Sequence, residues 1–482
     1  MSRARAIVRT LAKIAGIDPH RAEMARREYR RGYDAAGAGR RWAGMPEFRA
    51  QLATLHSSSA LIRARARPTV ANNAHATKGV SGWTSAMVGG GIKPQSTHPD
   101  PAKAEELNLL WEHWTPQADA DGGLDFNGLL GLAVRGMVID GESFCSFGFE
   151  NGQLKLRLID PDQIDSSRDQ QLTGGANIIQ GIELDRSGRR LAYHLFRDRI
   201  GLGFAWSQER VRLPASEVLH LFNPIVAGQL RGLSWFAPVL LRLADLDTAH
   251  DAQLVRQKIA ALLTGFIIDM EGTGGSLAES VADSFAETSL EPGEMRVLKS
   301  GQDVRFSEPA KVGAEVIDFL KITAREIAAG LGLPYEVLTG DLSDVNYSSI
   351  RAGLVEWRRQ VDALQRNVII HKFCRPIWRR FITTAILTGQ IDAPGFERNP
   401  EPYLSANWLT RRFDWVDPKK DVEAEIAAIN AGLMSRRQAV AGRGIDIEDL
   451  DREIAADRDR AKDLKLAFGG EPTASDKEVD DV

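Results

Sequence analysis

The segment "GLPYEVLTGDLSDVNYSSIR", residues 332–351, separates two stretches of apolar, helix-like sequence. Gly332 and Pro334 are typical helix-stopping residues, so the helix before the segment should end there. The middle of the segment, from Asp341 to Ser349, is strongly polar. Its Asp, Ser, Asn and Tyr side chains could be catalytic groups, or they could form a solvated loop between two helices.

The bulk composition indicates a large protein of ordinary polarity. The chain has 482 residues and a formal net charge of −4, which allows two or more domains and does not indicate a generally basic nucleic-acid binder. Cys145 and Cys374 lie far apart without metal-ligand spacing, so we expect reduced cysteines and no structural zinc. The sequence has no secretory signal and no apolar run near the roughly 20 residues that a membrane span needs. We therefore expect a soluble protein with no membrane partner.

The two ends of the chain have opposite charge. Residues 1–67 carry 15 Lys and Arg against 5 Asp and Glu, and residues 1–29 form a basic arm. This arm could be a solvated amphipathic helix, or it could contact phosphate or a partner. Residues 467–482 are acidic and poor in apolar side chains, which predicts a disordered tail.

The first half of the chain predicts helices followed by antiparallel strands. Residues 141–222 alternate apolar and polar positions, with hairpin turns at Asn151-Gly152 and Ser187-Gly188. Before them, the helical period predicts helices over 72–88, over 101–114 and onward from a capping Asp125. The fold class expected from this pattern is α+β.

The second half returns to the helical period. One helix is predicted from Gly232 to residue 264, with Ser234 as its cap, and another from Ala314 to Leu331. A small α/β insert, residues 265–310, lies between them and contains a predicted helix at 276–289.

A very long helix is predicted from about Ser348 to Leu387. Pro376 lies inside it and should kink it by removing a backbone hydrogen bond. The charged residues 417–465 should be helical again.

Common catalytic and nucleotide-binding motifs are absent from the sequence. There is no G-x-x-x-x-G-K-[ST] phosphate loop, no H-E-x-x-H and no G-x-S-x-G. Residues 119–127 lack the bidentate glutamate of a calcium loop and are better explained as a loop with a helix cap. His220 lies in an apolar strand and is best explained as a satisfied core histidine. Segment 332–351 offers no histidine or lysine base for a serine nucleophile.

Four stretches resemble, in the same order, the motifs of the portal proteins of lambda-like tailed bacteriophages and related prophages. The most specific is "GLPYEVLTGDLSDVNYSSIRAGLVEWRR" at 332–359. The others are "MVGGGIKPQ" at 87–95, "GQLRGLSWFAPVL" at 228–240 and "VDPKKDVEAEIAAINAGLMSRRQAVAGRGID" at 416–446. The resemblance covers roughly residues 30–466.

The resemblance implies a phage portal fold assembled as a homo-oligomeric ring, with twelve subunits as the usual number. Its parts are a mixed α/β wing, a helical stem, a small α/β clip and a helical crown. By order along this chain, the wing would be residues 30–231 and 348–416, and the stem helices 232–264 and 311–333. The clip would be 265–310, the tunnel loop region 334–347 and the crown 417–466.

The resemblance also implies a function without catalysis, cofactor or metal. The ring would sit at one capsid vertex of the virion, after assembly in the host cytoplasm, and double-stranded DNA would pass through it during packaging and ejection without sequence specificity. The implied partners are the terminase large subunit, the major capsid protein and scaffold, and head–tail adaptor proteins. The clip would carry the contacts to the motor and the adaptors.

In this interpretation the polar segment is a loop facing the DNA. DNA carries one negative charge per about 1.7 Å of helix axis, so a collar of lysines would bind it and impede sliding. The loop has no positive charge. Arg351 could contact phosphate weakly, or it could pair with a neighbouring subunit. The residues assigned to the DNA-channel loop are Asp341, Ser343, Asp344, Asn346, Tyr347 and Arg351, with Gly340 and Pro376 as hinges.

Two other functions stay open at this point. A metal-dependent hydrolase or nuclease could use the acidic loop, and metal-dependent turnover would support it. A capsid structural protein without a DNA channel is the second, and rings lacking an axial hole would support it.

Overall fold

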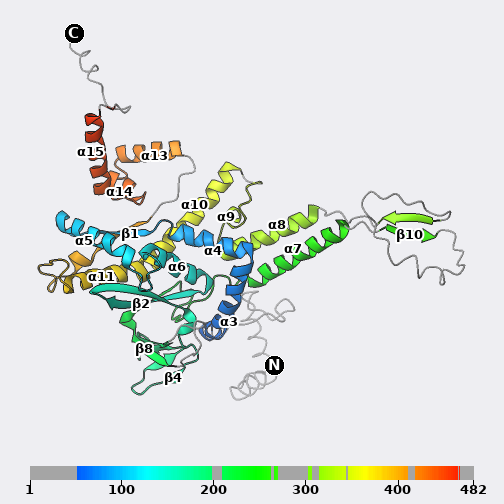
Figure 1. The fold of residues 1–482 in the computed structure, drawn as a ribbon, viewed down its shortest axis with the longest axis horizontal. Helices are drawn as coiled ribbons and strands as arrows, with labels where there is room; N and C mark the ends of the chain where they lie inside the picture. Colours follow the sequence, from blue (N-terminus) through cyan, green and yellow to red (C-terminus); the bar gives the residue numbers. More distant parts are fainter. Residues whose placement is uncertain are drawn as a thin grey trace, which may run out of the picture. The chain divides into compact units, whose positions relative to one another are not determined.

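The computed structural model describes residues 51–197, 209–261, 265–269, 302–306, 314–343, 346–410, 418–464 and 466 (Figure 1). Two compact units divide the chain, Met1–Thr54 and Leu55–Val482, and the features below belong to the second. The predictions for the basic arm 1–29, for a helix at 276–289 and for the acidic tail 467–482 lie outside the described residues. The observed mixture of helices and antiparallel strands confirms the expected α+β class.

The predicted helices of the first half are present with good caps. The Asn73 side chain accepts a hydrogen bond from Ala76 N–H, Asp100 accepts one from Ala102 N–H and Asp125 accepts one from Gly128 N–H. One further helix, α3, precedes them. The bounds are α3 Gln51–Asn72, α4 Ala74–Met87, α5 Pro101–Trp114 and α6 Phe126–Ile139.

A three-stranded antiparallel sheet, in the order β3-β2-β9, forms the centre of the main core. Its strands are β2 Glu142–Glu150, β3 Gln153–Ile159 and β9 Val218–Phe222. Successive side chains point to opposite faces. Cys145 and Leu219 therefore join the large apolar cluster with the helices, whereas their neighbours Phe144 and Val218 join a smaller cluster on the other face.

That smaller cluster belongs to a five-stranded antiparallel sheet. Its order is β4-β5-β6-β7-β8, so it is built from consecutive hairpins as the alternation predicted. Tyr193 and Ile182 are fully buried in it and pack with Phe144. The strands are β4 Gln170–Gln171, β5 Asn177–Ile179, β6 Ile182–Leu184, β7 Arg190–Phe196 and β8 Arg210–Pro214.

Two strands that the sequence did not indicate pair across a very long separation. β1 (Ile92–Ser96) is antiparallel to β12 (Ala406–Thr410), and the register puts Pro94 opposite Trp408. A short helix, α12 (Glu401–Leu404), precedes β12. The pair brings the glycine-rich turn at 89–91 next to the late part of the chain.

The helix predicted from Gly232 begins later than expected. α7 spans Leu240–Ala261, and the residues before it form turns. Ser234 does not cap the helix; its hydroxyl accepts a hydrogen bond from Phe236 N–H at 3.2 Å. Phe236 and Val239 are buried in the main core, and Pro238 cannot donate a backbone hydrogen bond, so tertiary packing favours turns here.

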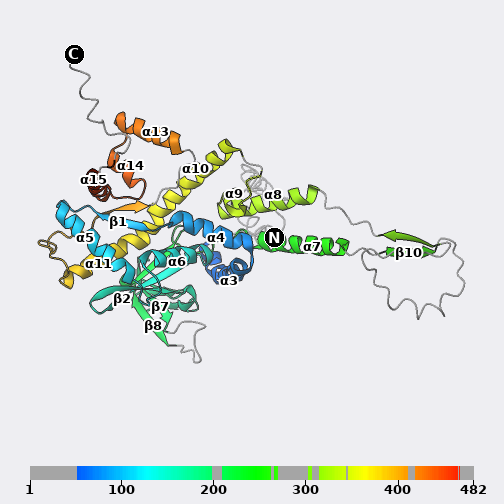
Figure 2. The same ribbon diagram turned by 45° about the horizontal axis from the view of Figure 1, so that its top comes forward.

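The partner helix of α7 has the bounds that the sequence predicted. α8 spans Ala314–Leu331, and Gly332 ends it in a left-handed conformation with φ 70°. Figures 1 and 2 show α7 and α8 side by side. A two-stranded antiparallel sheet, β10 (Gly265–Asp269) with β11 (Gln302–Phe306), comes between them in sequence.

The predicted long helix is continuous over its whole length, but its middle part is π-helical and not α-helical. α10 (Tyr347–Leu364) leads into a π-helical segment, Gln365–Cys374, which leads into α11 (Arg375–Leu387). Pro376 is the second residue of α11, inside the continuous helix, and it cannot donate a backbone hydrogen bond to the preceding turn. The kink predicted there stays a prediction. The predicted uniform α-helix is therefore wrong between 365 and 374.

The π segment brings the buried faces of the two halves into phase. On an uninterrupted α-helix, the step from Val361 to Phe381 would turn the buried face by roughly 200°. In a π-helix, residues five apart lie over one another because the hydrogen bonds run from i to i+5. The buried residues of the segment show this spacing: Gln365 with Ile370, Val368 with Phe373, and Ile369 with Cys374.

Three charged helices close the described chain, as predicted. α13 spans Pro418–Asn430, α14 Arg436–Ala441 and α15 Ile447–Asp463. Ser435 and Gln438 form a capping box at the start of α14. In the described part of the chain, no helix combines the length and hydropathy needed to cross a membrane.

Candidate functional site

The polar loop begins where a short helix, α9 (Tyr335–Thr339), ends. Gly340 follows α9 in a left-handed conformation with φ 75°, and its N–H donates to Glu336 O at 2.8 Å. No atom lies within 4 Å of the place where a Cβ would be. Glycine is therefore required here by backbone conformation and not by crowding. Whether it also acts as a hinge stays a prediction.

Asp341 holds the first part of the loop together. One carboxylate oxygen accepts hydrogen bonds from Ser343 N–H at 3.0 Å and from Ser343 Oγ at 2.6 Å, and the other accepts one from Tyr335 O–H at 3.1 Å. The bonds from Ser343 keep the pKa of Asp341 below its usual range. This carboxylate is engaged in local structure, like the side chain of an Asx turn.

Asn346 and Arg351 connect the loop to α10. The Asn346 side chain accepts from Ser349 N–H at 2.8 Å and is the N-cap of α10, which Tyr347 begins. Arg351 Nη2 lies 3.0 Å from Asp421 Oδ1 of α13 in the same chain. The loop residues thus share one segment, but Asp344 and the Tyr347 side chain lie outside the described residues.

A second group of polar side chains, which sequence reasoning missed, lies deep in the fold. Glu142, at the start of β2, is completely buried. Its carboxylate accepts hydrogen bonds from Arg231 Nε at 2.8 Å, Arg63 Nη1 at 3.2 Å and Gly232 N–H at 2.8 Å, and it lies 3.0 Å from His220 Nε2. We call these five residues the Glu142 network.

The charges of the network determine its protonation. Burial alone would raise the pKa of Glu142, but the charge of Arg231 and the hydrogen bond with His220 hold it far below the usual range. Burial lowers the pKa of His220 to about 4, against the opposing effect of Glu142. His220 is therefore neutral at pH 7, which agrees with the prediction of a satisfied core histidine.

The network joins four parts of the chain at one point. Arg63 comes from α3, His220 from β9, and Arg231 and Gly232 from the turns that lead into α7. The backbones of Gly141 and Gly232 approach so closely that a Cβ on Gly232 would lie 2.1 Å from Gly141 O. The only sequence signal was an isolated acidic residue at the start of an apolar strand, which is too weak to identify a network.

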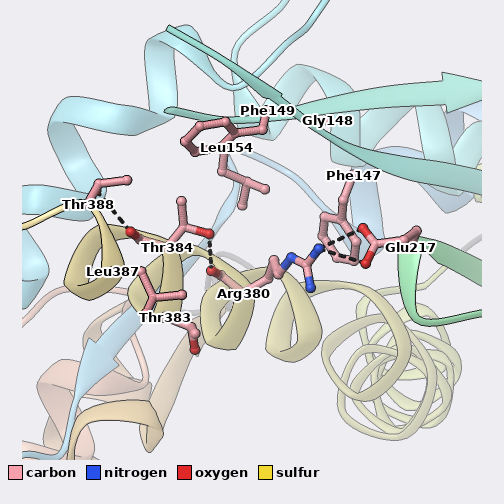
Figure 3. Close-up of a pocket in the computed structure, with 10 residues that line it drawn as sticks. All are labelled: Phe147, Gly148, Phe149, Leu154, Glu217, Arg380, Thr383, Thr384, Leu387 and Thr388. Carbon is pink, nitrogen blue, oxygen red and sulfur yellow. Dashed lines mark hydrogen bonds and ion pairs between the residues drawn. The ribbon is translucent and has the colours of Figure 1, made fainter. Parts of the chain in front are cut away.

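A surface cavity of about 430 Å³ lies between the β2–β3 hairpin and α11 (Figure 3). Figure 3 shows Phe149 and Leu154 of the hairpin on one side and Thr384 and Leu387 of α11 on the other. The ion pair between Arg380 and Glu217, at 2.6 Å, lies at one end. The ten residues around the cavity include no histidine or cysteine.

The described ranges contain no grouping of side chains suited to a metal ion. None of their His, Cys, Asp and Glu side chains form a group of three or more that could hold a metal ion. The Asp119 carboxylate, in the stretch that faintly resembles a calcium loop, accepts backbone hydrogen bonds from Gly123 and Leu124 at 2.9 and 3.0 Å. It acts there as a loop anchor.

Comparison with known protein families identifies the chain. The family described as phage portal protein, lambda family, matches residues 38–365, which include the glycine-rich turn, the turns leading into α7, and the loop. This chain belongs to the lambda family of phage portal proteins. The resemblance seen in the sequence motifs is thereby confirmed.

Several curated relatives carry portal names. The probable portal protein of Halomonas phage phiHAP-1 is 27% identical over 319 residues, covering 64% of this chain and 61% of the relative's length. The portal protein of Escherichia phage N15 is 24% identical over 504 residues, covering 93% of each. Portal protein B of Escherichia phage lambda is 22% identical over 413 residues, covering 77% of this chain and 76% of that protein.

Solved structures with a related chain come from gene transfer agent particles. A chain from the neck of an empty particle has a TM-score of 0.46 and 16% identity, covering 86% of this chain and 98% of that one. A chain from the virion of a native particle has a TM-score of 0.44 and 15% identity, covering 85% and 97%.

Proposed function

We propose that this chain is a portal subunit: copies form a ring at a capsid vertex, and double-stranded DNA passes through the ring. The observation that carries the proposal is the match of residues 38–365 to the lambda family of portal proteins. In this proposal the terminase large subunit of the motor and the head–tail adaptors dock on the ring through the region around β10 and β11. The major capsid protein and scaffold surround the ring.

The helices α7 and α8 support assembly into a ring. Each carries large apolar side chains that its own chain leaves more than half exposed, although the two helices pack on each other. These are Leu241, Leu254 and Val255 on α7, and Ile317, Phe319 and Ile322 on α8. Fully burying such a side chain is worth about 1.5–3 kcal/mol, so a neighbouring copy that covers this face would gain stability at every subunit boundary.

The loop supports the DNA channel. From Gly340 to Ile350 the sequence has no lysine or arginine, and Arg351 is engaged with Asp421. A ring of such loops would guide a polyanion without binding it tightly. The rival hydrolase would use the carboxylates of the loop, of which the described one, Asp341, accepts hydrogen bonds from Ser343 and Tyr335.

The test of the channel loop is a lysine at Leu342. Its side chain is 61% exposed, so Leu342→Lys adds one positive charge per subunit without breaking the bonds of Asp341. We expect DNA packaging into proheads to slow by about twofold or more at low salt and to recover as salt rises, because counterion release drives the attraction.

The control is Leu342→Gln, which has the same exposure without the charge. Packaging velocity is measured against ionic strength for the wild type and both variants, and the wild type gives the motor's own salt response. Coinciding curves for Leu342→Lys and Leu342→Gln would show that this loop does not face the DNA.

A further inference from the structure

The three C-terminal helices, residues 418–464, form a small unit with its own contacts. α14 packs on α15, and Ala439, Val440 and Ala461 are buried. In the described ranges, none of the side chains of 418–464 belongs to the large apolar cluster or packs against it. The C-terminal helical unit is therefore docked on the rest of the chain mainly through polar side chains.

The first docking contact reaches the helix that follows the loop. Arg351 lies in the second turn of α10, and Asp421 lies in the first turn of α13. Their side chains are 40% and 24% exposed, and the distance from Nη2 to Oδ1 is 3.0 Å. Asn346, the N-cap of the same helix, lies about one helical turn before Arg351, so the ion pair is close to the end of the loop.

The second docking contact joins α15 to α5 and β1. Arg452 Nη1 lies 2.8 Å from Glu105 Oε1, Lys93 Nζ lies 3.6 Å from Asp449 Oδ2, and Gln95 Nε2 donates to Asp446 Oδ2 at 2.7 Å. Asp446 is 9% exposed, and burial raises the pKa of its carboxyl, whereas the side chains of Arg452 and Glu105 are 60% and 50% exposed. The unit is thus held at one end by the main body and at the other by α10.

We propose that the C-terminal helical unit is an electrostatic latch for the polar loop. When it is docked, the Arg351–Asp421 pair restrains the first turns of α10 and with them the end of the loop. When its ion pairs are screened or exchanged, α13 leaves α10, and the first turns of α10 and their N-cap Asn346 gain freedom. In a portal ring this latch would determine how rigid each loop is when DNA passes it. That consequence rests on the proposed function, whereas the latch itself does not depend on it.

Charge reversal tests the latch directly. Arg351→Glu and Asp421→Arg each put like charges face to face, and the double variant restores the pair with its direction reversed. We expect about five- to tenfold faster amide hydrogen exchange at 346–351 and in α13 for each single variant, and values within about twofold of the wild type for the double variant.

Arg359→Glu is the matched control. Arg359 lies on the same helix but is 75% exposed, and its ion pair is with Glu356 one turn away, so exchange at 346–351 should not change. In the wild type, raising salt from about 0.05 to 0.5 M should reproduce part of the single-variant effect, because the Debye length shortens severalfold.

Two results would overturn the proposal: unchanged exchange near the loop in both single variants, or a double variant as fast as the singles. Hydrogen exchange needs no DNA and no motor. A protein that shows the latch but fails the packaging test with Leu342→Lys would therefore refute the channel loop alone.

Discussion

Replacing Glu142 with alanine is expected to lower the free energy of unfolding by about 3–5 kcal/mol, as for other broken buried ion pairs. The substitution leaves the guanidinium of Arg231, whose side chain is 3% exposed, without its carboxylate, whereas Arg63 keeps its ion pair with Asp162 at 2.8 Å. It also leaves Gly232 N–H, beside the close approach to Gly141, without its acceptor. Unpaired buried charge is costly because the interior solvates it poorly.

The matched control for Glu142 is Glu401→Ala. Glu401 also makes two hydrogen bonds with one arginine, Arg379, at 2.8 and 3.1 Å, but its side chain is 60% exposed. Exposed pairs contribute about 0–1 kcal/mol. Urea unfolding at one protein concentration compares the two variants. Equal losses of stability would mean that the Glu142 network is not a junction of the fold.

Sequence reasoning succeeded where structure is decided locally. α5 and α8 have the predicted bounds because Asp100 caps one helix and Gly332 ends the other. The hairpin between β2 and β3 turns at Asn151 and Gly152, both with positive φ, as the Asn-Gly pair predicted. Each of these signals needs only a few consecutive residues.

Sequence reasoning failed where contacts between residues far apart in the chain determine the local structure. α7 starts at Leu240 because Phe236 and Val239 pack into the main core, which helical periodicity alone cannot show. The π segment satisfies Gln365, whose side chain donates to Met87 O at 2.8 Å, and that contact joins residues 278 apart. Buried residues of the segment are both four and five apart, so the sequence pattern alone does not distinguish a π-helix from an α-helix.

The candidate site shows the same division. The loop and its lack of lysine and arginine were readable from one segment of sequence, whereas the left-handed conformation of Gly340 was not among the predictions. The partner of Arg351 was not, because Asp421 lies 70 residues further along the chain. The Glu142 network draws its members from residues 63 to 232, and no single stretch contains its pattern.

Placing aspartates at Phe319 and Ile322 of α8 is expected to abolish ring assembly. The two side chains are 59% and 55% exposed and lie three residues apart, so they share one helix face. If a neighbouring copy covers that face, each subunit boundary would have to bury two unpaired carboxylates, at a cost of several kcal/mol. Light scattering and negative-stain microscopy would then find monomers or small oligomers in place of rings with an axial hole.

The same pair of changes should have little effect on the isolated subunit, and this separates assembly from folding. Because Phe319 and Ile322 are more exposed than buried, the helical circular dichroism signal and the unfolding temperature at low protein concentration should remain near those of the wild type. Leu387→Asp with Leu433→Asp is the control, since these leucines are 79% and 82% exposed and lie on α11 and just after α13. Rings from the control and none from the α8 variant would assign the subunit boundary to α8. If both variants form rings, the exposed apolar face of α8 is not part of the subunit boundary and no longer supports the proposed assembly.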